Sequence, residues 1–480
     1  MSSLCDLETG RRQVAEIRRL LAGRPGGVHL VGVAGIGMAG LAVHLAARGF
    51  RVSGCDLCLN RVSDALASCG VDVLPGHSPS HISADIQWLV KSTAVPDDGD
   101  EILAAKTKGL PVYPRGAVLP TLLEGRTSVA VTGTHGKTTT SAMIAQVLAG
   151  GGLKPGFCIG GEVTALGGVA APGAGKILVV EADESDGTVI LYEPDVSVIT
   201  NIEYDHMEHF RDEDTLVGCL KTFAANAKRR VIFCADDPRA IAVCEKHPKG
   251  FSYGFSARAD LRGTDIEETA SSVSLSIFLK GRKLGRIALP VPGCHNAQDA
   301  LAACAAAMEL GLSFEQVRDG LGEFTHVRRR FEKVVDRDGL LVISDYAHHP
   351  TEIQALVKTA LQLKKKKVIG VFQPHRYTRT LALGKDFPPA FAGLSEVVLV
   401  PVYEASETPL AGGTSEDLFK HFQSFGRVPT RYIPSLEEAW RYLKTNLGKG
   451  DLLLVIGAGD VEKIAGWARQ EYATRNNINT

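Results

Sequence analysis

Short apolar runs rich in valine and isoleucine recur along nearly the whole chain, and longer segments with helical spacing separate them. Such runs are typical of strands buried on both faces, and their alternation with helices predicts parallel sheets of the doubly wound type. The pattern therefore predicts an α/β fold in which this architecture is repeated. The runs lie at residues 28–33, 87–92, 128–133, 177–183, 196–200, 229–234, 341–347, 367–372, 396–402 and 452–459.

The pattern changes in places that divide the chain. Residues 109–120 are rich in proline and glycine and precede an apolar run, so a boundary is expected near residue 121. Residues 251–293 have alternating polarity and turn signals, as expected of an antiparallel extension. A second boundary is expected near the RRRF sequence at 328–331. A chain of 480 residues has room for about three domains, and those predicted are residues 1–121, 122–328 and 329–480.

The overall charge argues against two classes of partner. The formal net charge is -1, whereas proteins that bind nucleic acid or a membrane surface need a basic excess to neutralise phosphate. No apolar run reaches the roughly 20 residues that a membrane span requires, and the N-terminus lacks the apolar segment of a signal peptide. The sequence predicts a cytoplasmic protein with no nucleic-acid or membrane partner.

The ten cysteines favour reduced thiols over a disulfide framework. They are scattered from Cys5 to Cys304, and most stand in apolar contexts that are typical of buried thiols in a large chain. Cys55 and Cys58 form a CxxC pair, but no second pair follows at metal-binding spacing. We interpret this pair as having no special role.

Residues 127–140, TSVAVTGTHGKTTT, have the order of a phosphate-binding loop: strand, glycines, lysine, threonine, helix. The loop is two residues shorter between its glycines than the common form. It still offers backbone N–H groups for an anion, a lysine for the β- and γ-phosphates, and a hydroxyl for Mg²⁺. A simple strand-to-helix turn would leave Lys137 unexplained. ATP-binding candidates here are Gly133, Thr134, His135, Gly136, Lys137, Thr138 and Thr139.

Two further strands end in groups suited to a cation. The run at 177–183 continues into Glu181, Asp183, Glu184 and Asp186, and carboxylates beside phosphates usually hold hard cations. The run at 196–200 is followed by Asn201, Asp205 and His206. A lone histidine is more often structural than a ligand, but this position at a strand's carboxyl end also suits a site residue. Both strand ends are expected to face the nucleotide.

Seven motifs in order give the chain a resemblance to the Mur ligase family: TGTHGKTTT, EADESD, TNIEYDH, GCHNAQDALAA, RRRFE, SDYAHHP and FQPHRYTRT. The resemblance covers essentially the whole chain. It implies three domains: a Rossmann-like domain for a UDP-substrate, a central P-loop ATPase-like domain, and a C-terminal Rossmann-like domain for an amino acid. The motifs GIGMAG, DYAHHP and HRYTRT are most similar to members acting on UDP-N-acetylmuramate and L-alanine.

The resemblance implies an activity in peptidoglycan synthesis, and hence in cell wall biogenesis, cell shape and division. ATP with Mg²⁺ would phosphorylate the carboxylate of UDP-N-acetylmuramate, and the amine of L-alanine would attack the acyl phosphate, giving ADP and phosphate. Lys137, Glu181, His206 and Arg330, or else Arg329, are the catalytic candidates. Thr138, Glu181 and His206 are the metal candidates. Asn296 would lie on the adenine side, and Asp345 and Arg329 would meet the nucleotide from the third domain.

The first and third domains contribute further candidates by resemblance. Alone, GIGMAG followed by Asp56 would suggest a dinucleotide dehydrogenase. The resemblance instead assigns this loop to the diphosphate of the UDP-sugar, with candidates Gly35, Gly37, Met38, Gly40, Asp56, His77, Ser92 and Thr93. In the third domain, arginine suits a carboxylate because its planar fork binds both oxygens; the alternative is a basic surface turn. The amino-acid candidates are Tyr346, His348, His375, Arg376 and Arg379.

Two positions depart from the family pattern, and some alternatives stay open. Asp299 stands where an asparagine is expected, and an ionised carboxylate accepts but cannot donate a hydrogen bond. Gly116 stands where an acidic residue is expected. The rival functions are a related peptide-adding ligase, a folate polyglutamate synthetase, a nicotinamide-dependent oxidoreductase, and an ATP-binding switch without chemistry. The sequence is consistent with a monomer or a weak homodimer.

Overall fold

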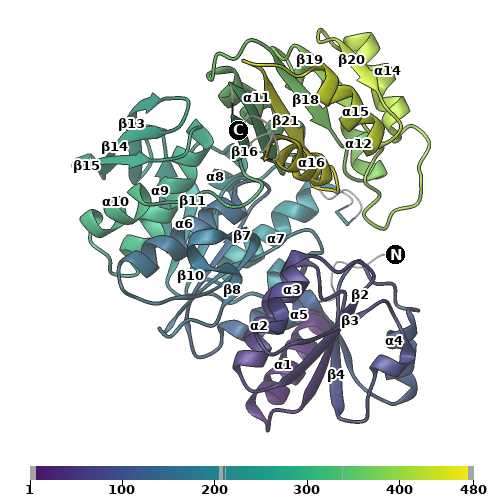
Figure 1. Cartoon of the computed structure of the whole chain (residues 1–480). Coiled ribbons are helices and arrows are strands. Elements are labelled where there is room, and N and C mark those ends of the chain that lie inside the picture. Colours follow the sequence, from purple (N-terminus) through teal and green to yellow (C-terminus); the bar gives the residue numbers. More distant parts are fainter. Residues whose placement is uncertain (1–6, 205–208, 211, 338, 474–480) are drawn as a thin grey trace, which may run out of the picture.

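The computed structural model has three sheets stacked along its length, with the N-terminal domain at one end and the C-terminal domain at the other (Figure 1). It describes residues 7–204, 209–210, 212–337 and 339–473. All ten strands predicted from apolar runs are confirmed, and no helix within these residues is long and apolar enough to cross a membrane.

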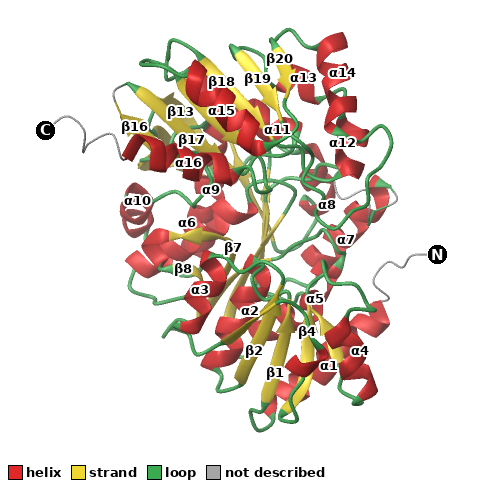
Figure 2. Ribbon diagram, turned by 45° about the vertical axis from the view of Figure 1, so that its right-hand side comes forward, coloured by secondary structure: helices red, strands yellow, loops and turns green. Residues whose placement is uncertain are grey.

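The N-terminal sheet is parallel, with strand order β3-β2-β1-β4-β5 and helices on both sides (Figure 2). Its strands form from the apolar runs because β1 and most of β4 are buried on both faces. The strands are β1 (Gly27–Val31), β2 (Arg51–Asp56), β3 (Asp72–Pro75), β4 (Ile86–Lys91) and β5 (Val112–Pro114). The helices are α1 (Leu7–Ala22), α2 (Ile36–Ala47), α3 (Arg61–Ala67), η1 (Pro79–His81), α4 (Asp100–Thr107), α5 (Arg115–Val118) and η2 (Leu119–Leu123).

The central sheet joins a parallel core to the antiparallel extension predicted at 251–293, which is confirmed. Its order is β15-β14-β13-β12-β11-β10-β6-β9-β7-β8, and β6 lies between β10 and β9 in parallel. The strands are β6 (Thr127–Thr132), β7 (Gly156–Val163), β8 (Gly168–Ala171), β9 (Ile177–Glu181), β10 (Val196–Ile199), β11 (Arg230–Cys234), β12 (Gly250–Gly254), β13 (Leu261–Glu268), β14 (Val273–Leu279) and β15 (Arg282–Leu289). The helices are α6 (Lys137–Gly150), η3 (Thr164–Leu166), η4 (Thr188–Leu191), α7 (Glu213–Ala225), α8 (Pro238–Cys244), α9 (Cys294–Glu309) and α10 (Phe314–Gly322).

The C-terminal sheet has the order β16-β17-β21-β18-β19-β20, parallel except for the first hairpin. Its strands are β16 (Glu332–Arg337), β17 (Leu340–Asp345), β18 (Val368–Phe372), β19 (Glu396–Leu399), β20 (Thr430–Tyr432) and β21 (Leu452–Ile456). Its helices are α11 (Pro350–Leu361), α12 (Tyr377–Leu383), α13 (Phe387–Ala390), α14 (Ser415–Phe425), α15 (Leu436–Asn446) and α16 (Glu462–Ala473).

Specific contacts fix the domains against one another. His44 on α2 hydrogen-bonds the carbonyl of Phe157 on β7 at 2.9 Å, and Gly40 faces Cys158 so closely that a Cβ would come within 2.4 Å of its Sγ. Arg328 pairs with Glu162 at 3.2 Å and with Glu462 of α16 at 2.9 Å. The boundaries predicted near residues 121 and 328 fall between the three sheets and stay predictions.

Candidate active site

Two cavities adjoin each other at the carboxyl ends of the central strands. The larger, of about 650 Å³, is lined by all three domains, and the smaller, of about 440 Å³, by the central and C-terminal domains. They share Gly136 of the phosphate loop, Val327, Arg330 and Glu352. A substrate in one cavity can therefore meet a substrate in the other at the loop.

The phosphate loop joins β6 to α6 through two glycines in the left-handed region. Gly133 has φ +125° and lies against Thr200, and Gly136 has φ +80° at the start of α6. Both conformations favour glycine, and they let the loop turn sharply into a helix whose first N–H groups attract an anion. Lys137, Thr134, Thr138 and Gly136 line the larger cavity, while His135, Gly136 and Thr139 line the smaller.

Lys137 is held at the centre of an acidic strand end. Its Nζ donates to the carbonyl of Gly133 at 2.6 Å and to Glu184 Oε1 at 2.9 Å. Burial opposes the charge on Lys137, but Glu184, Asp183 and Glu181 raise the pKa of its ammonium to about 12. The lysine is therefore a fixed cation beside the loop.

Thr138 and Glu181 bring two hard oxygen donors together next to Lys137. The Thr138 hydroxyl donates to Glu181 Oε1 at 3.2 Å, and the Gly160 N–H donates to Glu181 Oε2 at 2.7 Å. Burial raises the pKa of Glu181, so a cation would compensate a real desolvation cost here. A hydroxyl and a carboxylate are ligands that Mg²⁺ prefers, and this donor set fits the ion. The third metal candidate, His206, and Asp205 lie outside the described residues.

His135 connects the loop to the third domain through groups that the sequence did not single out. Its ring pairs with Glu203 at 3.0 Å and with Glu352 of α11 at 3.2 Å, and His349 reaches Glu203 at 3.5 Å. Burial opposes protonation, but these two carboxylates raise the pKa of His135 to about 9. His135 is thus cationic at neutral pH. The sequence SDYAHHPTE contains Glu352, but it does not show that this glutamate lies next to His135 in the fold.

The three arginines at the domain junction share some partners but differ in the cavities that they line: Arg328 and Arg329 both pair with Glu462, and Arg329 and Arg330 both lie over the Tyr346 ring. Arg330 lines both cavities, pairs with Glu352 at 3.7 Å and lies 5.3 Å from the Tyr346 ring. Arg329, at φ +58°, donates to the carbonyl of Gly457 at 2.5 Å and of Gly459 at 3.0 Å. Asp345 accepts from the Phe331 and Ala347 N–H groups at 2.7 and 2.8 Å, and it lines the smaller cavity. These contacts favour Arg330 as the arginine aimed at the reacting groups.

The predicted amino-acid residues all line the larger cavity: Tyr346, His348, His375, Arg376 and Arg379. Arg379 is buried on α12 beside His375, and Arg376 has φ +72° at the start of that helix and pairs with Glu407 at 3.5 Å. The HRYTRT turn is therefore an inward-facing basic wall. This arrangement argues against the alternative of a basic surface turn.

Of the residues predicted to bind the UDP-substrate, only one lines the larger cavity. Gly37 lines it, whereas Gly35, Met38, Gly40, Asp56, His77, Ser92 and Thr93 are not among its lining residues. Asp56 accepts from the Ala34 N–H at 3.0 Å and so holds the glycine loop, and Met38 is buried. His77 lies in a separate cluster with Cys55 and Glu101. Their substrate contacts stay predictions.

Arg115 is a site residue that the sequence did not indicate. It covers Gly37, where a Cβ would come within 2.6 Å of its Nη1, and it pairs with Asp183 at 3.0 Å. It thus brings a cation of the first domain to the strand end of the second. Its neighbour Gly116 packs against Thr188, and a Cβ would come within 2.2 Å of the Thr188 hydroxyl. An acidic side chain at Gly116 would displace Thr188, so the second domain occupies the space that the family pattern gives to that acid.

Asp299 is the second residue that departs from the family pattern, and it lies behind the phosphate loop. It accepts from the Thr140 hydroxyl at 3.1 Å and stands where a Cβ on Gly136 would touch it at 2.5 Å. Burial raises the pKa of Asp299 to about 7. A protonated Asp299 can donate a hydrogen bond as the expected asparagine would. Asp299 therefore differs most from the expected asparagine above pH 7, where its carboxyl is ionised.

We expect Asp299→Asn to stabilise the protein increasingly as pH rises. The folded state binds one more proton than the unfolded state between the carboxyl's ordinary pKa near 3.8 and about 7. Stability is therefore lost as pH rises through this window, and the loss amounts to about 4 kcal/mol when complete. Thermal unfolding midpoints of both proteins at pH 5 and pH 8 measure the difference. An equal gap at both pH values would contradict a raised pKa at Asp299.

Three family models match the chain in succession. They are described as Mur ligase family, catalytic domain, over residues 27–127; Mur ligase middle domain, over 131–307; and Mur ligase, glutamate ligase domain, over 329–459. Their junctions fall where one sheet gives way to the next.

Similar proteins of known name match over nearly the whole length. The UDP-N-acetylmuramate--L-alanine ligase of Carboxydothermus hydrogenoformans is 39% identical over 452 residues, covering 94% of this chain and 96% of the relative. That of Salinibacter ruber is 39% identical over 455 residues, covering 93% and 95%. The crystal structure of the UDP-N-acetylmuramate-alanine ligase of Thermotoga maritima matches with a TM-score of 0.82 at 27% identity, covering 94% and 100%. A murein peptide ligase from Psychrobacter arcticus, with a TM-score of 0.72 and 21% identity, shares the fold.

Proposed function

The chain belongs to the Mur ligase family, and from this premise we propose that it joins L-alanine to the carboxylate of UDP-N-acetylmuramate at the expense of ATP. The observation that carries the proposal is the larger cavity. It sets the lysine of a phosphate loop between a glycine loop of the first domain and a basic wall of the third. The carboxylate of a nucleotide sugar can then reach the γ-phosphate of ATP, and the amine of an amino acid can reach the acyl phosphate that forms.

The chemistry has two steps, because a carboxylate does not accept an amine directly. The carboxylate first attacks the γ-phosphorus of ATP, which breaks the bond to ADP and forms an acyl phosphate. The alanine amine then attacks the acyl carbon, and the tetrahedral intermediate expels phosphate as the amide forms. Positioning and charge neutralisation are the protein's main contributions to such transfers.

The central domain supplies most of the charge for the first step. Lys137 would stabilise the γ-phosphoryl group as it is transferred. Its ammonium would then pair with phosphate oxygens in place of Glu184. Thr138 and Glu181 would hold Mg²⁺, which when bound neutralises phosphate oxygens. Arg330 borders both cavities and would add a cation where the phosphoryl group passes between substrates. The smaller cavity, with Asn296 and Asp345 in its wall, would take the nucleoside.

The outer domains hold the two other substrates. Gly37 and the start of α2 would bind the diphosphate of the UDP-sugar, with Arg115 above the same loop. Arg376 and Arg379 would bind the alanine carboxylate, which leaves its amine free to face the acyl phosphate. The cytoplasmic location and the monomeric or weakly dimeric state remain our predictions.

Phosphate release tests the proposed function. ATP, Mg²⁺ and UDP-N-acetylmuramate are combined with the purified chain, with and without L-alanine, and then with glycine, L-serine or the tripeptide. Release that needs both the UDP-sugar and L-alanine is the expected result. Release with the tripeptide alone would still agree with a Mur ligase, but it would assign the chain the specificity of a peptide-adding ligase. No release with any pair would return the chain to the binding-only or oxidoreductase alternatives.

A further inference from the structure

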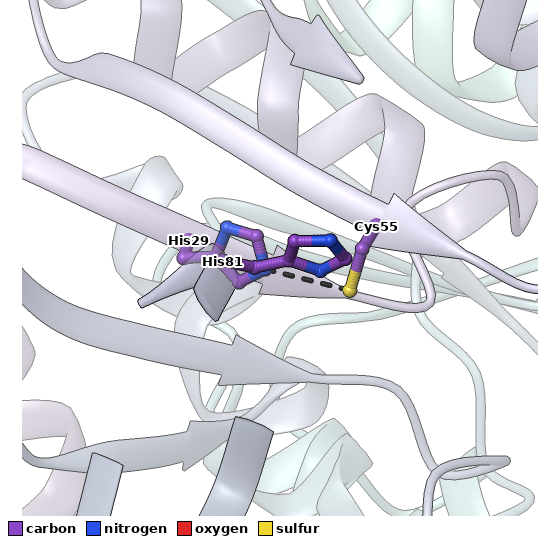
Figure 3. Close-up of side chains that lie close together, drawn as sticks. All are labelled: His29, Cys55 and His81. Atoms are coloured by element: carbon purple, nitrogen blue, oxygen red, sulfur yellow. Dashed lines mark hydrogen bonds between the residues drawn. The ribbon is translucent and has the colours of Figure 1, made fainter. Parts of the chain in front are cut away.

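A cluster of metal-ligand side chains lies in the N-terminal domain, outside the two cavities of the active site. Cys55 on β2, His77 after β3, His81 on η1 and Glu101 on α4 converge there from four separate segments. Figure 3 shows Cys55 and His81 with His29 of β1, whose ring is hydrogen-bonded to the cysteine. We propose that this cluster is a structural Zn²⁺ site, with Cys55, His77, His81 and Glu101 as the ligands.

The first observation is the crowding on a single oxygen. Glu101 Oε1 has Cys55 Sγ, His77 Nδ1 and His81 Nδ1 each at 3.2 Å. It also accepts from the Ser78 N–H at 2.7 Å. One carboxylate oxygen has about two lone pairs to offer, so four donors exceed what it can accept well. One cation at the centre of the cluster would replace the protons of these donors and so relieve the excess.

The second observation is the spacing of the donor atoms. Cys55 Sγ, His77 Nδ1 and Glu101 Oε1 form a triangle with sides of 3.4, 3.2 and 3.2 Å. Bond lengths to zinc place neighbouring ligand atoms of a tetrahedron roughly 3.3–3.6 Å apart. His81 Nδ1 lies 3.2 Å from Glu101 Oε1, but His81 groups with Cys55 and His29 and not with His77 and Glu101, so its ring must move to reach the fourth corner. The triangle of Cys55, His77 and Glu101 already has the spacing that the ion needs, and His81 is the ligand that has to move to enclose it.

Burial and charge favour a divalent ion of this type. Cys55 is fully buried and Glu101 is 1% exposed. A thiolate and a carboxylate together carry two negative charges, which one Zn²⁺ neutralises, whereas either anion alone would be costly in this place. Sulfur with imidazole selects zinc over magnesium or calcium. The His77 and His81 side chains are 24% and 13% exposed, and they give the ion a path from solvent.

His29 fits the role of a partner to the thiolate. Its Nδ1 lies 2.8 Å from the Ser53 hydroxyl and its Nε2 lies 3.4 Å from Cys55 Sγ. With the Ser53 hydroxyl as donor to Nδ1, the neutral ring carries its proton on Nε2 and donates to sulfur. Such outer hydrogen bonds fix a metal ligand in its orientation.

The site adjoins the glycine loop of the first domain through the backbone of Cys55. The Cys55 carbonyl accepts from the N–H groups of Gly32 and Val33 at 2.8 and 3.0 Å. The next residue, Asp56, accepts from the Ala34 N–H. A bound ion would therefore stiffen the loop that precedes α2.

Cobalt replaces zinc in a test that reports sulfur ligation directly. The full-length chain is freed of metal with a chelator and titrated with Co²⁺, which gives a thiolate-to-cobalt absorption band only when a cysteine is a ligand. The expected result is a band that saturates at one equivalent and disappears when Zn²⁺ is added. The His135, Glu203 and His349 group lacks sulfur and cannot produce this band. Absence of the band in the unaltered chain would overturn the proposal.

Two cysteine variants form a matched pair. Cys58 is exposed and three residues beyond Cys55, so Cys58→Ser should keep the band, whereas Cys55→Ser should lose it. A band that survives Cys55→Ser overturns the assignment. If Cys55→Ser does not fold, His81→Gln and Glu101→Gln decide. Each should weaken Co²⁺ and Zn²⁺ binding by at least the roughly 10–100-fold that loss of an outer partner costs, and unchanged affinity in both overturns the ligand set.

Discussion

Lys137→Ala is expected to lower phosphate release by about 10³-fold or more, because a charge that stabilises a moving phosphoryl group carries an effect of this size. The lysine stands at the only turn of the described chain where a strand, two left-handed glycines and a helix meet an acidic strand end. The fall is expected in kcat, measured by steady-state phosphate release. The dissociation constant for UDP-N-acetylmuramate, measured by calorimetry, should change little because we propose that this substrate binds on the first domain.

The variant also removes the lysine that pairs with Glu184, a glutamate that is 1% exposed, and this structural effect needs its own control. Removal of one member of a buried ion pair costs roughly 3–5 kcal/mol. Lys137→Ala combined with Glu184→Gln should restore the thermal midpoint without restoring turnover. Lys221→Ala, an exposed lysine on α7, should leave both unchanged. Recovery of turnover in the double variant would show that Lys137 acts through folding alone.

The fold was predictable because its signals are local. Each of the ten apolar runs forms a largely buried strand, so burial leaves a continuous mark in the sequence. The alternation in 273–279 likewise reflects one covered face of β14. The relative placement of the domains left no such mark. It depends on contacts such as Gly40 with Cys158, which are ordinary residues when read alone.

The candidate site was predictable where one segment makes it. The phosphate loop and the HRYTRT turn each carry their chemistry within ten residues, and the structure places both on the larger cavity. Glu352, Glu203 and Arg115 were missed because their partners lie on other elements. The CxxC pair shows that a local motif can also mislead. Its spacing is a familiar signal, yet Cys58 is exposed and Cys55 instead meets histidines that are 22 and 26 residues away.

The glycine loop GIGMAG shows why a motif alone could not decide the function. Its helix N-terminus suits the diphosphate of a dinucleotide and of a UDP-sugar equally. In the structure this loop opens onto a cavity that also contains Lys137 and the basic wall of the third domain. A hydride transfer would have no use for either group. The neighbouring domains therefore determine which ligand the loop serves, and they favour the ligase.

Arg330→Ala is the second change expected to have a large effect, a fall in kcat of about 10³-fold, comparable to the loss of an arginine that stabilises phosphoryl transfer from a neighbouring domain. Among the arginines at 328–330, Arg330 alone lines both cavities, so its guanidinium can follow the phosphoryl group between them. Its partner Glu352 keeps His135 at 3.2 Å and His348 at 3.4 Å, so the fold should tolerate the loss. The KM for L-alanine should change little, because we propose that Arg376 and Arg379 bind that substrate.

Arg329→Ala provides the comparison that separates the two arginines. Arg329 donates to the Gly457 and Gly459 carbonyls and pairs with Glu462 at 3.3 Å, so its loss should lower the thermal midpoint more than it lowers kcat. Arg469→Ala, an exposed arginine on α16 that pairs with Glu332, serves as the neutral control. A thousandfold loss of kcat in Arg329→Ala with near-normal turnover in Arg330→Ala would reverse the assignment. Such a result would mean that the C-terminal domain rotates on substrate binding and brings the other guanidinium to the phosphoryl group.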